Sequence, residues 1–249
     1  MALAAALFAL PVAHWVHVTS DEARLLRLLP DEIPANKELN AFAMARGRSA
    51  FARRCAGCHG SAGEPDTLHG VPDLRDHDWL YGSGRIGEIE RVILYGIRSG
   101  NSKGWNLASM PAFGTAHPYS RYAIPSLTPR ELADVTEYVY SFQHSDADSV
   151  AAVRGKQVFE GQSRGLCWDC HGGLGTGDAS IGAPNLRDSI WLFGDGSRRS
   201  IHASIAYGRA GICPAWIGKL SPVTIVALAV YTNSLWHNAS DNAERADRK

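Results

Sequence analysis

The chain has 249 residues, of which 45% are hydrophobic and 20% charged. This composition is that of an ordinary globular protein and excludes disorder and fibrous repeats. Lysine plus arginine and aspartate plus glutamate both number 25, so the formal net charge is zero and the chain lacks the electrostatic footprint of a nucleic-acid-binding protein. The 25 glycines and 12 prolines interrupt the helix-forming windows, which indicates small helices rather than a large regular sheet.

The N-terminal segment is apolar. Residues 1–13 carry no charge, and the run is shorter than the ~20 residues that a membrane-spanning helix needs. We expect residues 1–20 to be an export signal or an N-terminal membrane anchor, with a buried helix as the alternative. Residues 21–44 follow as a spacer that contains a short helix.

The chain contains an internal repeat, and the repeat sets the expected domain organisation. Cys55-Ala-Gly-Cys58-His59 recurs 112 residues later as Cys167-Trp-Asp-Cys170-His171. Three further blocks recur at the same offset: Pro72-Asp-Leu-Arg-Asp76 with Pro184-Asn-Leu-Arg-Asp188, Trp79-Leu-Tyr-Gly82 with Trp191-Leu-Phe-Gly194, and Tyr95-Gly96 with Tyr207-Gly208. The sequence therefore predicts two homologous units placed one after the other.

The boundaries of the units follow from the ends of the matched blocks. We expect the first unit at residues 45–143, a polar linker at 144–150, the second unit at 151–236 and a solvated polar tail at 237–249. Each unit is expected to close with a helix that begins at Thr128-Pro129 or Ser221-Pro222, because a hydroxyl N-cap followed by proline is a helix start.

The two C-x-x-C-H motifs carry the chemistry. This pattern is the attachment signature of c-type heme: two thiols bind the porphyrin covalently, and the adjacent histidine supplies an imidazole to the iron. A structural zinc site usually needs two nearby ligand pairs, and a redox dithiol usually lies near a βαβ pattern. Neither explains a histidine directly after both cysteine pairs. We therefore predict two covalent hemes, with His59 and His171 as axial ligands to iron.

Each iron needs a sixth ligand or an open position, and methionines are few. Met110 stands in a Ser-Met-Pro-Ala loop after the first motif, where a thioether can return to the distal heme face. We expect Met110 to ligate the first iron; the alternative is a buried loop methionine. His/Met ligation raises the reduction potential. Met44 lies in a helical run ahead of the motif, where core packing is expected.

The second unit contains no methionine, and Cys213 occupies the place that corresponds to Met110. Cys213-Pro-Ala matches Met110-Pro-Ala, so we expect Cys213 to ligate the second iron. The alternative is a small buried side chain, with the iron open or bound elsewhere. His202 is the main rival ligand and His237 a weaker one. An anionic sulfur favours ferric iron, so the two hemes are expected to differ in potential.

Aromatic and basic residues recur near both motifs. Trp79, Tyr81, Trp191 and Phe193 are expected to pack against the heme edges. Arg98 and Arg209 follow the Tyr-Gly pairs, where they would either neutralise propionates or lie at the surface.

Residues 45–236 resemble the di-heme class I cytochromes c, and especially the di-heme subunit of cbb3-type cytochrome oxidases. The resemblance lies in both C-x-x-C-H motifs, the paired Trp-Leu-Tyr/Phe-Gly blocks and the Met/Cys-Pro-Ala loops. It implies an all-α protein of two tandem class I cytochrome c folds, each wrapped around one covalent heme. The family's axial ligands fall on His59, Met110 and His171, and its second methionine falls on Cys213, where this chain departs from the pattern.

These features favour an electron carrier without catalytic residues of its own, which passes electrons to a terminal oxidase or another membrane redox complex. Expected partners are oxidase subunits, quinol–cytochrome c reductase or soluble cytochromes, and the expected location is the bacterial periplasm, soluble or tethered to the inner membrane. The alternative is an enzyme that uses the second heme, resembling thiosulfate dehydrogenase or a di-heme peroxidase. A heme-based sensor is a third hypothesis.

Overall fold

A computed structural model describes residues 20–115, 125–161 and 165–246. Among these residues there is no β-strand, only isolated bridges between extended segments, and this confirms the all-α prediction. Residues 20–25 are helical, and the later elements are η1 (Pro30–Ala35), α2 (Lys37–Arg54), α3 (Ala56–His59), α4 (Ile86–Tyr95), α5 (Pro129–Tyr140), α6 (Ser149–Phe159), α7 (Cys167–His171), α8 (Arg198–Tyr207) and α9 (Pro222–Ala246). The segment expected to be an export signal or anchor lies almost entirely outside the described residues.

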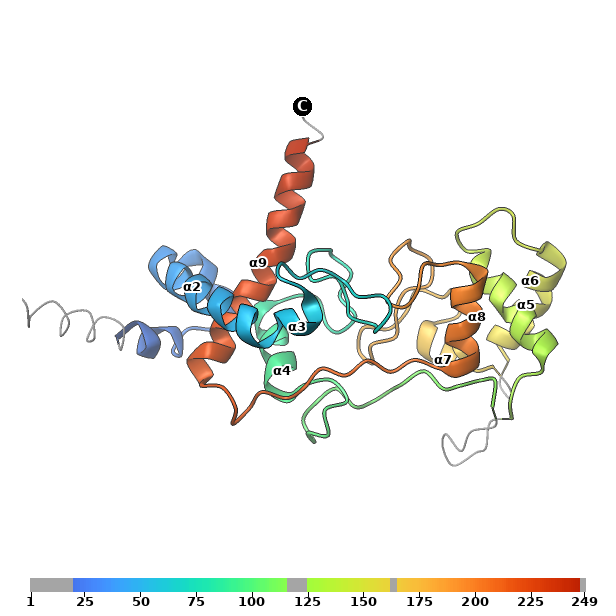
Figure 1. Cartoon of the computed structure of the whole chain (residues 1–249), viewed down its shortest axis with the longest axis horizontal. Helices are drawn as coiled ribbons and strands as arrows, with labels where there is room; N and C mark the ends of the chain where they lie inside the picture. Colours follow the sequence, from blue (N-terminus) through green and yellow to red (C-terminus); the bar gives the residue numbers. More distant parts are fainter. Residues whose placement is uncertain (1–19, 116–124, 162–164, 247–249) are drawn as a thin grey trace, which may run out of the picture.

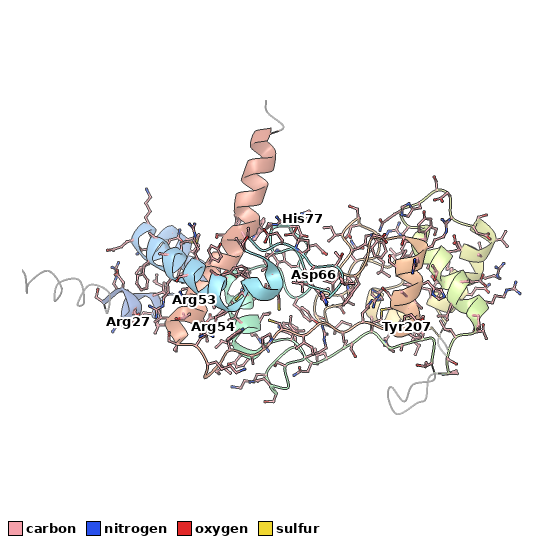
Figure 2. All side chains as sticks on the ribbon, in the orientation of Figure 1. Arg27, Arg53, Arg54, Asp66, His77 and Tyr207 are labelled. Carbon is pink, nitrogen blue, oxygen red and sulfur yellow. The ribbon has the colours of Figure 1, made fainter. Side chains whose placement is uncertain are left out.

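The helices form two lobes (Figure 1). The first lobe contains α2, α3, α4 and the last helix, α9; the second contains α5, α6, α7 and α8. Helix α2 begins at Lys37, inside the segment expected to be a spacer, and ends with Arg53 and Arg54, whose positive charges suit a helix C-terminus (Figure 2). Helix α9 continues to Ala246, so the residues expected to be a solvated tail extend this helix.

The core of the first lobe lies between α2 and α9. Leu39 and Ala43 on α2 pack with Val226, Ala227 and Val230 on α9, and all five are buried. Near the first cysteine motif, Phe51 packs with Leu228 and Tyr231, with Cys55 at the border of the cluster. The long C-terminal helix of the chain therefore closes the lobe that holds the first motif.

The core of the second lobe lies between α5, α6 and α8. Leu132 and Val135 on α5 pack with Phe159 on α6 and with Ile201 and Ile205 on α8, and Cys167 lies at the border of this cluster. Thr128 caps α5 through a capping box with Glu131, as the hydroxyl-proline pattern predicts. The helix expected to close the first unit therefore closes the second lobe.

The observed lobes differ from the two consecutive units expected at residues 45–143 and 151–236, because the two closing helices are exchanged. Two extended segments make the exchange: residues 96–113 lead from α4 into the second lobe, and residues 208–221 lead back from α8 to α9 (Figure 1). At ~3.3 Å per residue, the returning segment reaches about 45 Å, enough to pass from one lobe to the other.

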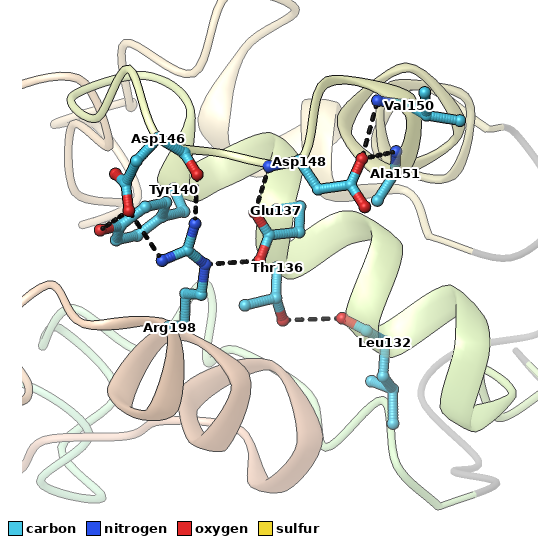
Figure 3. A network of polar contacts seen from close by, with 9 residues as sticks. All are labelled: Leu132, Thr136, Glu137, Tyr140, Asp146, Asp148, Val150, Ala151 and Arg198. Carbon is cyan, nitrogen blue, oxygen red and sulfur yellow. Dashed lines mark hydrogen bonds and ion pairs between the residues drawn. The ribbon is translucent and has the colours of Figure 1, made fainter.

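Polar contacts join α8 to the turn between α5 and α6, which includes the expected linker. Arg198 on α8 donates to Glu137 at 2.6 Å and to the Asp146 carbonyl at 2.7 Å, and its guanidinium stacks over the Tyr140 ring (Figure 3). Asp148 caps α6 by accepting from two of its backbone amides (Figure 3). Residues 144–148 are thus an ordered turn within the second lobe, and residues 149–150 begin α6.

Glycines allow the closing helices to approach closely in both lobes. A Cβ at Gly47 on α2 would overlap the backbone carbonyl of Ala227 on α9, and a Cβ at Gly155 on α6 would overlap that of Asp134 on α5. We expect Gly47→Ala and Gly155→Ala each to lower the free energy of unfolding of one lobe by about 2–3 kcal/mol, because the backbones must separate. Denaturant titration with a spectroscopic probe of each lobe measures this.

Gly87→Ala on α4 is the matched control for both variants. A Cβ there meets only the Asp31 carboxylate at 3.3 Å, so the gain in helix propensity should leave stability unchanged or slightly higher. Equal losses from all three alanines would contradict the close approach as the cause.

Asp134 on α5 and Arg154 on α6 form an acid-sensitive ion pair in the second lobe. Asp134 is buried and accepts from the Arg154 guanidinium at 2.8 and 2.6 Å, and this hydrogen bonding lowers the pKa of Asp134. A carboxyl whose pKa is lower in the folded state stabilises the fold above its unfolded pKa, near 4, and loses that contribution as the pH falls further.

We expect Asp134→Asn to lower the stability of this lobe by about 1–2 kcal/mol at pH 7, because Arg154 loses its charged partner. The difference from the unsubstituted protein should shrink as the pH falls below about 4, which thermal melts at several pH values can follow. A difference that stays constant down to pH 3 would show that the carboxylate charge is unimportant.

Candidate heme-binding sites

The first C-x-x-C-H motif lies at the junction of α2 and α3. Cys55 follows the last residue of α2, and Ala56–His59 form the single turn α3. Burial raises the pKa of the Cys55 thiol to about 11, with smaller contributions from Cys213 and Cys58, whereas Cys58 is exposed. One cysteine thus faces the lobe interior while the other lies at its surface.

The second motif has the same local form. Cys167–His171 make the helix α7, and burial raises the pKa of Cys167 to about 12. Leu166, directly before this helix, has a positive φ of 52° that turns the chain into it.

The two motif histidines face the backbone carbonyls of matched prolines. His171 is buried, and its Nδ1 lies 3.0 Å from the carbonyl oxygen of Pro184, so Nδ1 bears the proton and donates it. His59 Nδ1 is also buried and faces the carbonyl of the equivalent Pro72 without closing a hydrogen bond. Burial lowers the pKa of both imidazoles, and the carbonyl acts in the opposite direction. Each ring is therefore neutral at pH 7, with Nε2 available to a metal.

Cys213 lies beside the first motif, not beside the second. It is half-buried, and burial raises the pKa of its thiol to about 11, with the nearby Cys58 acting in the same direction. The segment that carries it pairs with residues after α4: Cys213 N donates to Ile97 O at 3.0 Å, and Ile97 N donates to Cys213 O at 2.8 Å. Three thiols and the His59 imidazole thus belong to one lobe.

Met110 lies in the second lobe. Its backbone pairs with Arg209 in both directions, at 2.9 and 3.1 Å, and its side chain packs against the buried cluster of α5, α6 and α8 that borders Cys167. The order of the sequence repeats predicts Met110 beside the first motif and Cys213 beside the second. The structure instead places Met110 near the second motif and Cys213 near the first. Each sulfur lies on a segment that passes from one lobe to the other and leads to an exchanged helix, so each belongs to the lobe that this helix completes.

The other candidate ligands take ordinary positions. Met44 packs against the buried clusters of the first lobe. His202 lies on α8, and His237 lies on α9, where its ring contacts Trp236.

Sequence reasoning missed a set of contacts between the lobes. Tyr81 of the first lobe touches Gly182 of the second, and the equivalent Phe193 touches the equivalent Gly70; a Cβ on either glycine would overlap the ring. Two backbone hydrogen bonds repeat the symmetry: Gly82 N to Ala179 O at 3.2 Å and Gly194 N to Thr67 O at 3.0 Å. The repeat contains a sequence signal for these contacts, because each contacting residue in one lobe has its equivalent 112 residues away in the other. The lobes are related by a pseudo-twofold arrangement.

The donor set of each lobe fits a covalently attached heme. Each lobe offers two thiols in helical spacing, a neutral buried imidazole with its Nδ1 turned toward a carbonyl, and one further sulfur on a separate extended segment. Such a set suits a heme iron, which takes imidazole and sulfur ligands.

Comparison with known proteins agrees with this assignment. The Cytochrome c family profile matches residues 44–143. The chain is 38% identical over 217 residues to the cbb3-type cytochrome c oxidase subunit FixP of Azorhizobium caulinodans, covering 87% of this chain and 68% of that protein. It is 38% identical to the CcoP subunit of an Azospirillum species, covering 82% and 66%, and 38% identical to FixP of a Bradyrhizobium species, covering 82% and 65%. The alignments thus span about two thirds of these relatives.

The helical fold and the cysteine-histidine sites define a c-type cytochrome that binds heme c. More specifically, the chain belongs to the FixP/CcoP family of cbb3-type cytochrome c oxidase subunits. Within the described residues, no helix is both long and apolar enough to cross a membrane.

Proposed function

We propose that this chain is a di-heme electron carrier that delivers electrons to the catalytic subunits of a cbb3-type oxidase. The carrying observation is the duplicated donor set: two lobes, each with a C-x-x-C-H helix and an additional sulfur. The similarity to FixP and CcoP subunits supports the oxidase as acceptor. We place the lobes on the periplasmic side of the membrane, tethered or free, because heme attachment to C-x-x-C-H motifs takes place outside the bacterial cytoplasm.

We further propose a crossed set of axial ligands. Cys55 and Cys58 would hold the first heme, with His59 and Cys213 as the ligands to its iron. Cys167 and Cys170 would hold the second, with His171 and Met110 as the ligands to its iron. The support is the placement of Cys213 beside Cys55 and Cys58, and of Met110 in the cluster that borders Cys167.

This arrangement accounts for electron transfer without substrate binding. The heme supplies a one-electron Fe(III)/Fe(II) couple, and the protein groups set its potential. His59 and Cys213 in one lobe, and His171 and Met110 in the other, would be the protein ligands to iron, so that no position would be left for a substrate. The Tyr81–Gly182 and Phe193–Gly70 contacts hold the lobes against each other, so that the two carriers keep a fixed separation.

Mass spectrometry of protein matured with a c-type heme attachment system tests the assignment. We expect two covalent hemes, one on the peptide with Cys55 and Cys58 and one on the peptide with Cys167 and Cys170. The ferrous protein should not bind carbon monoxide, and it should reduce a purified cbb3-type oxidase core that lacks its own FixP/CcoP subunit. A single heme, or carbon monoxide binding at either iron, would contradict the proposal and favour an enzyme or a sensor.

A further inference from the structure

Arg98 lies where the two extended segments cross. Its Nε donates to the carbonyl oxygen of Gly211 at 2.5 Å, and its Nη1 donates to that of Ala108 at 2.8 Å. Gly211 comes two residues before Cys213, and Ala108 comes two residues before Met110. One guanidinium thus holds the backbone of both sulfur-bearing segments.

The same side chain also reaches the contact between the lobes. Arg98 Nη1 donates to the hydroxyl of Tyr81 at 2.9 Å, and the Tyr81 ring touches Gly182 in the second lobe. These hydrogen bonds end on neutral oxygens, and among the described residues no carboxylate lies within ion-pair distance of Arg98. The guanidinium charge is therefore not cancelled by an acidic neighbour in the described part of the chain.

The backbone of Arg98 is strained. Its φ is +47°, and Arg98 and Leu166 are the two non-glycine residues with positive φ in the described ranges. The left-handed region is unfavourable for a non-glycine residue, because its Cβ approaches the following carbonyl oxygen. Strain of this kind persists where surrounding contacts fix the residue, and here the side-chain hydrogen bonds do so.

Arg209, which follows the second Tyr-Gly pair, does not make an equivalent connection. Its Nε donates to Ser204 at 3.0 Å and its guanidinium lies over the Phe193 ring, and both of these residues belong to the second lobe. Backbone pairs also join the two segments, but of these two arginines only Arg98 connects them through its side chain.

We infer that Arg98 is a positioning residue for both heme sites: it fixes the segments of Cys213 and Met110 together and places one positive charge between them. The inference rests on the crossed ligand set proposed above. A change at Arg98 therefore acts on both hemes at once, whereas a change at either sulfur acts on one.

The test is a potentiometric titration of the full di-heme chain with Arg98→Gln, together with ferric EPR and the Met–iron charge-transfer band. We expect both midpoint potentials to move downward, because a nearby positive charge favours the ferrous state and has been removed. We also expect the Cys–iron and Met–iron signals to shift and broaden as the two segments loosen, with both bonds retained, because loss of the Cys–iron bond would itself raise that potential. Arg98→Lys, which retains the charge but lacks the planar fork, should restore most of the potential shift and little of the ligand signals.

Arg198→Gln is the matched control, because Arg198 also donates three hydrogen bonds through its guanidinium, but to Glu137 and Asp146, which lie on neither sulfur-bearing segment (Figure 3). It should lower the melting temperature and leave both potentials unchanged. Arg98 would be merely structural if Arg98→Gln lowered the melting temperature in the same way without moving either potential, or if it moved only one. Absence of Cys–iron and Met–iron signals from the unsubstituted protein would instead contradict the ligand assignment itself.

Discussion

Cys213→Met is expected to raise the potential of the heme bound to Cys55 and Cys58 and to leave that of the other heme nearly unchanged. The ligand changes from an anionic sulfur to a neutral thioether, which removes charge stabilisation of Fe(III), so the shift is upward. A shift on the order of 200 mV corresponds to roughly 5 kcal/mol, since 59 mV of a one-electron couple is about 1.4 kcal/mol. A potentiometric titration that separates both hemes measures it.

The buried environment of Cys213 makes the direction of this shift clear. Burial raises the pKa of its thiol to about 11, so without a cation beside it the sulfur is protonated at pH 7. Ferric iron is the cation that would stabilise the thiolate, and the bond is then strongest in the oxidised state. Cys213→Ser should therefore also weaken the ferric state, and thus raise the potential, without restoring a thioether bond.

A variant with a single heme decides which iron Cys213 ligates. Cys167→Ser combined with Cys170→Ser leaves only the first attachment site. In that background we expect the EPR signal of the Cys–iron bond to persist, and Cys213→Met to raise the one remaining midpoint. Loss of the Cys–iron signal together with the second heme would show that Cys213 serves its own sequence repeat and would contradict the crossed ligand set.

Much of the local structure could be predicted from sequence. The C-x-x-C-H pattern placed the thiols and the two imidazoles, and the hydroxyl-proline pairs placed the starts of α5 and α9. These features depend only on neighbours along the chain, where spacing and capping chemistry are decisive. Pro72 and Pro184, whose carbonyls face His59 and His171, also lie in the recurring blocks, but sequence alone does not indicate this role.

The exchange of helices could not be predicted in the same way. The two closing helices occupy the same position in their repeats, so the repeat pattern does not say which helix packs in which lobe. The decisive facts are spatial: Phe159 packs with Val135, and Phe51 packs with Leu228. One signal was available. The connection from α5 to α6 is short, and a short connection favours antiparallel neighbours in a helical protein over a linker between independent units at residues 144–150.

The crossing has a consequence for function. In a simple tandem arrangement, each heme site would be complete within one stretch of sequence, and the two potentials could vary independently. Here the segment between α4 and α5 carries the sulfur of one lobe, and the segment between α8 and α9 carries that of the other. Arg98 connects the two segments, so the two sites share one structural element.

A substitution in each closing helix is expected to unfold the lobe of the other sequence repeat. Leu228 on α9 and Val135 on α5 are both fully buried, each in a cluster that borders one cysteine motif. An aspartate at either position places an unpaired charge in an apolar core, which costs several kcal/mol and exceeds what one small lobe can tolerate. Leu228→Asp should therefore unfold the first lobe, and Val135→Asp the second.

The spectra of these variants identify the lobe that each helix completes. Leu228→Asp should remove the Cys–iron signal and retain the Met–iron band, and Val135→Asp should do the opposite. Limited proteolysis should agree, with early cleavage near Cys55 in the first variant and near Cys167 in the second. Leu107→Asp, at an exposed position on the crossing segment, serves as the control and should change neither signal. If Leu228→Asp instead damaged the lobe of Cys167, each closing helix would belong to its own sequence repeat, and the exchange would be ruled out in solution.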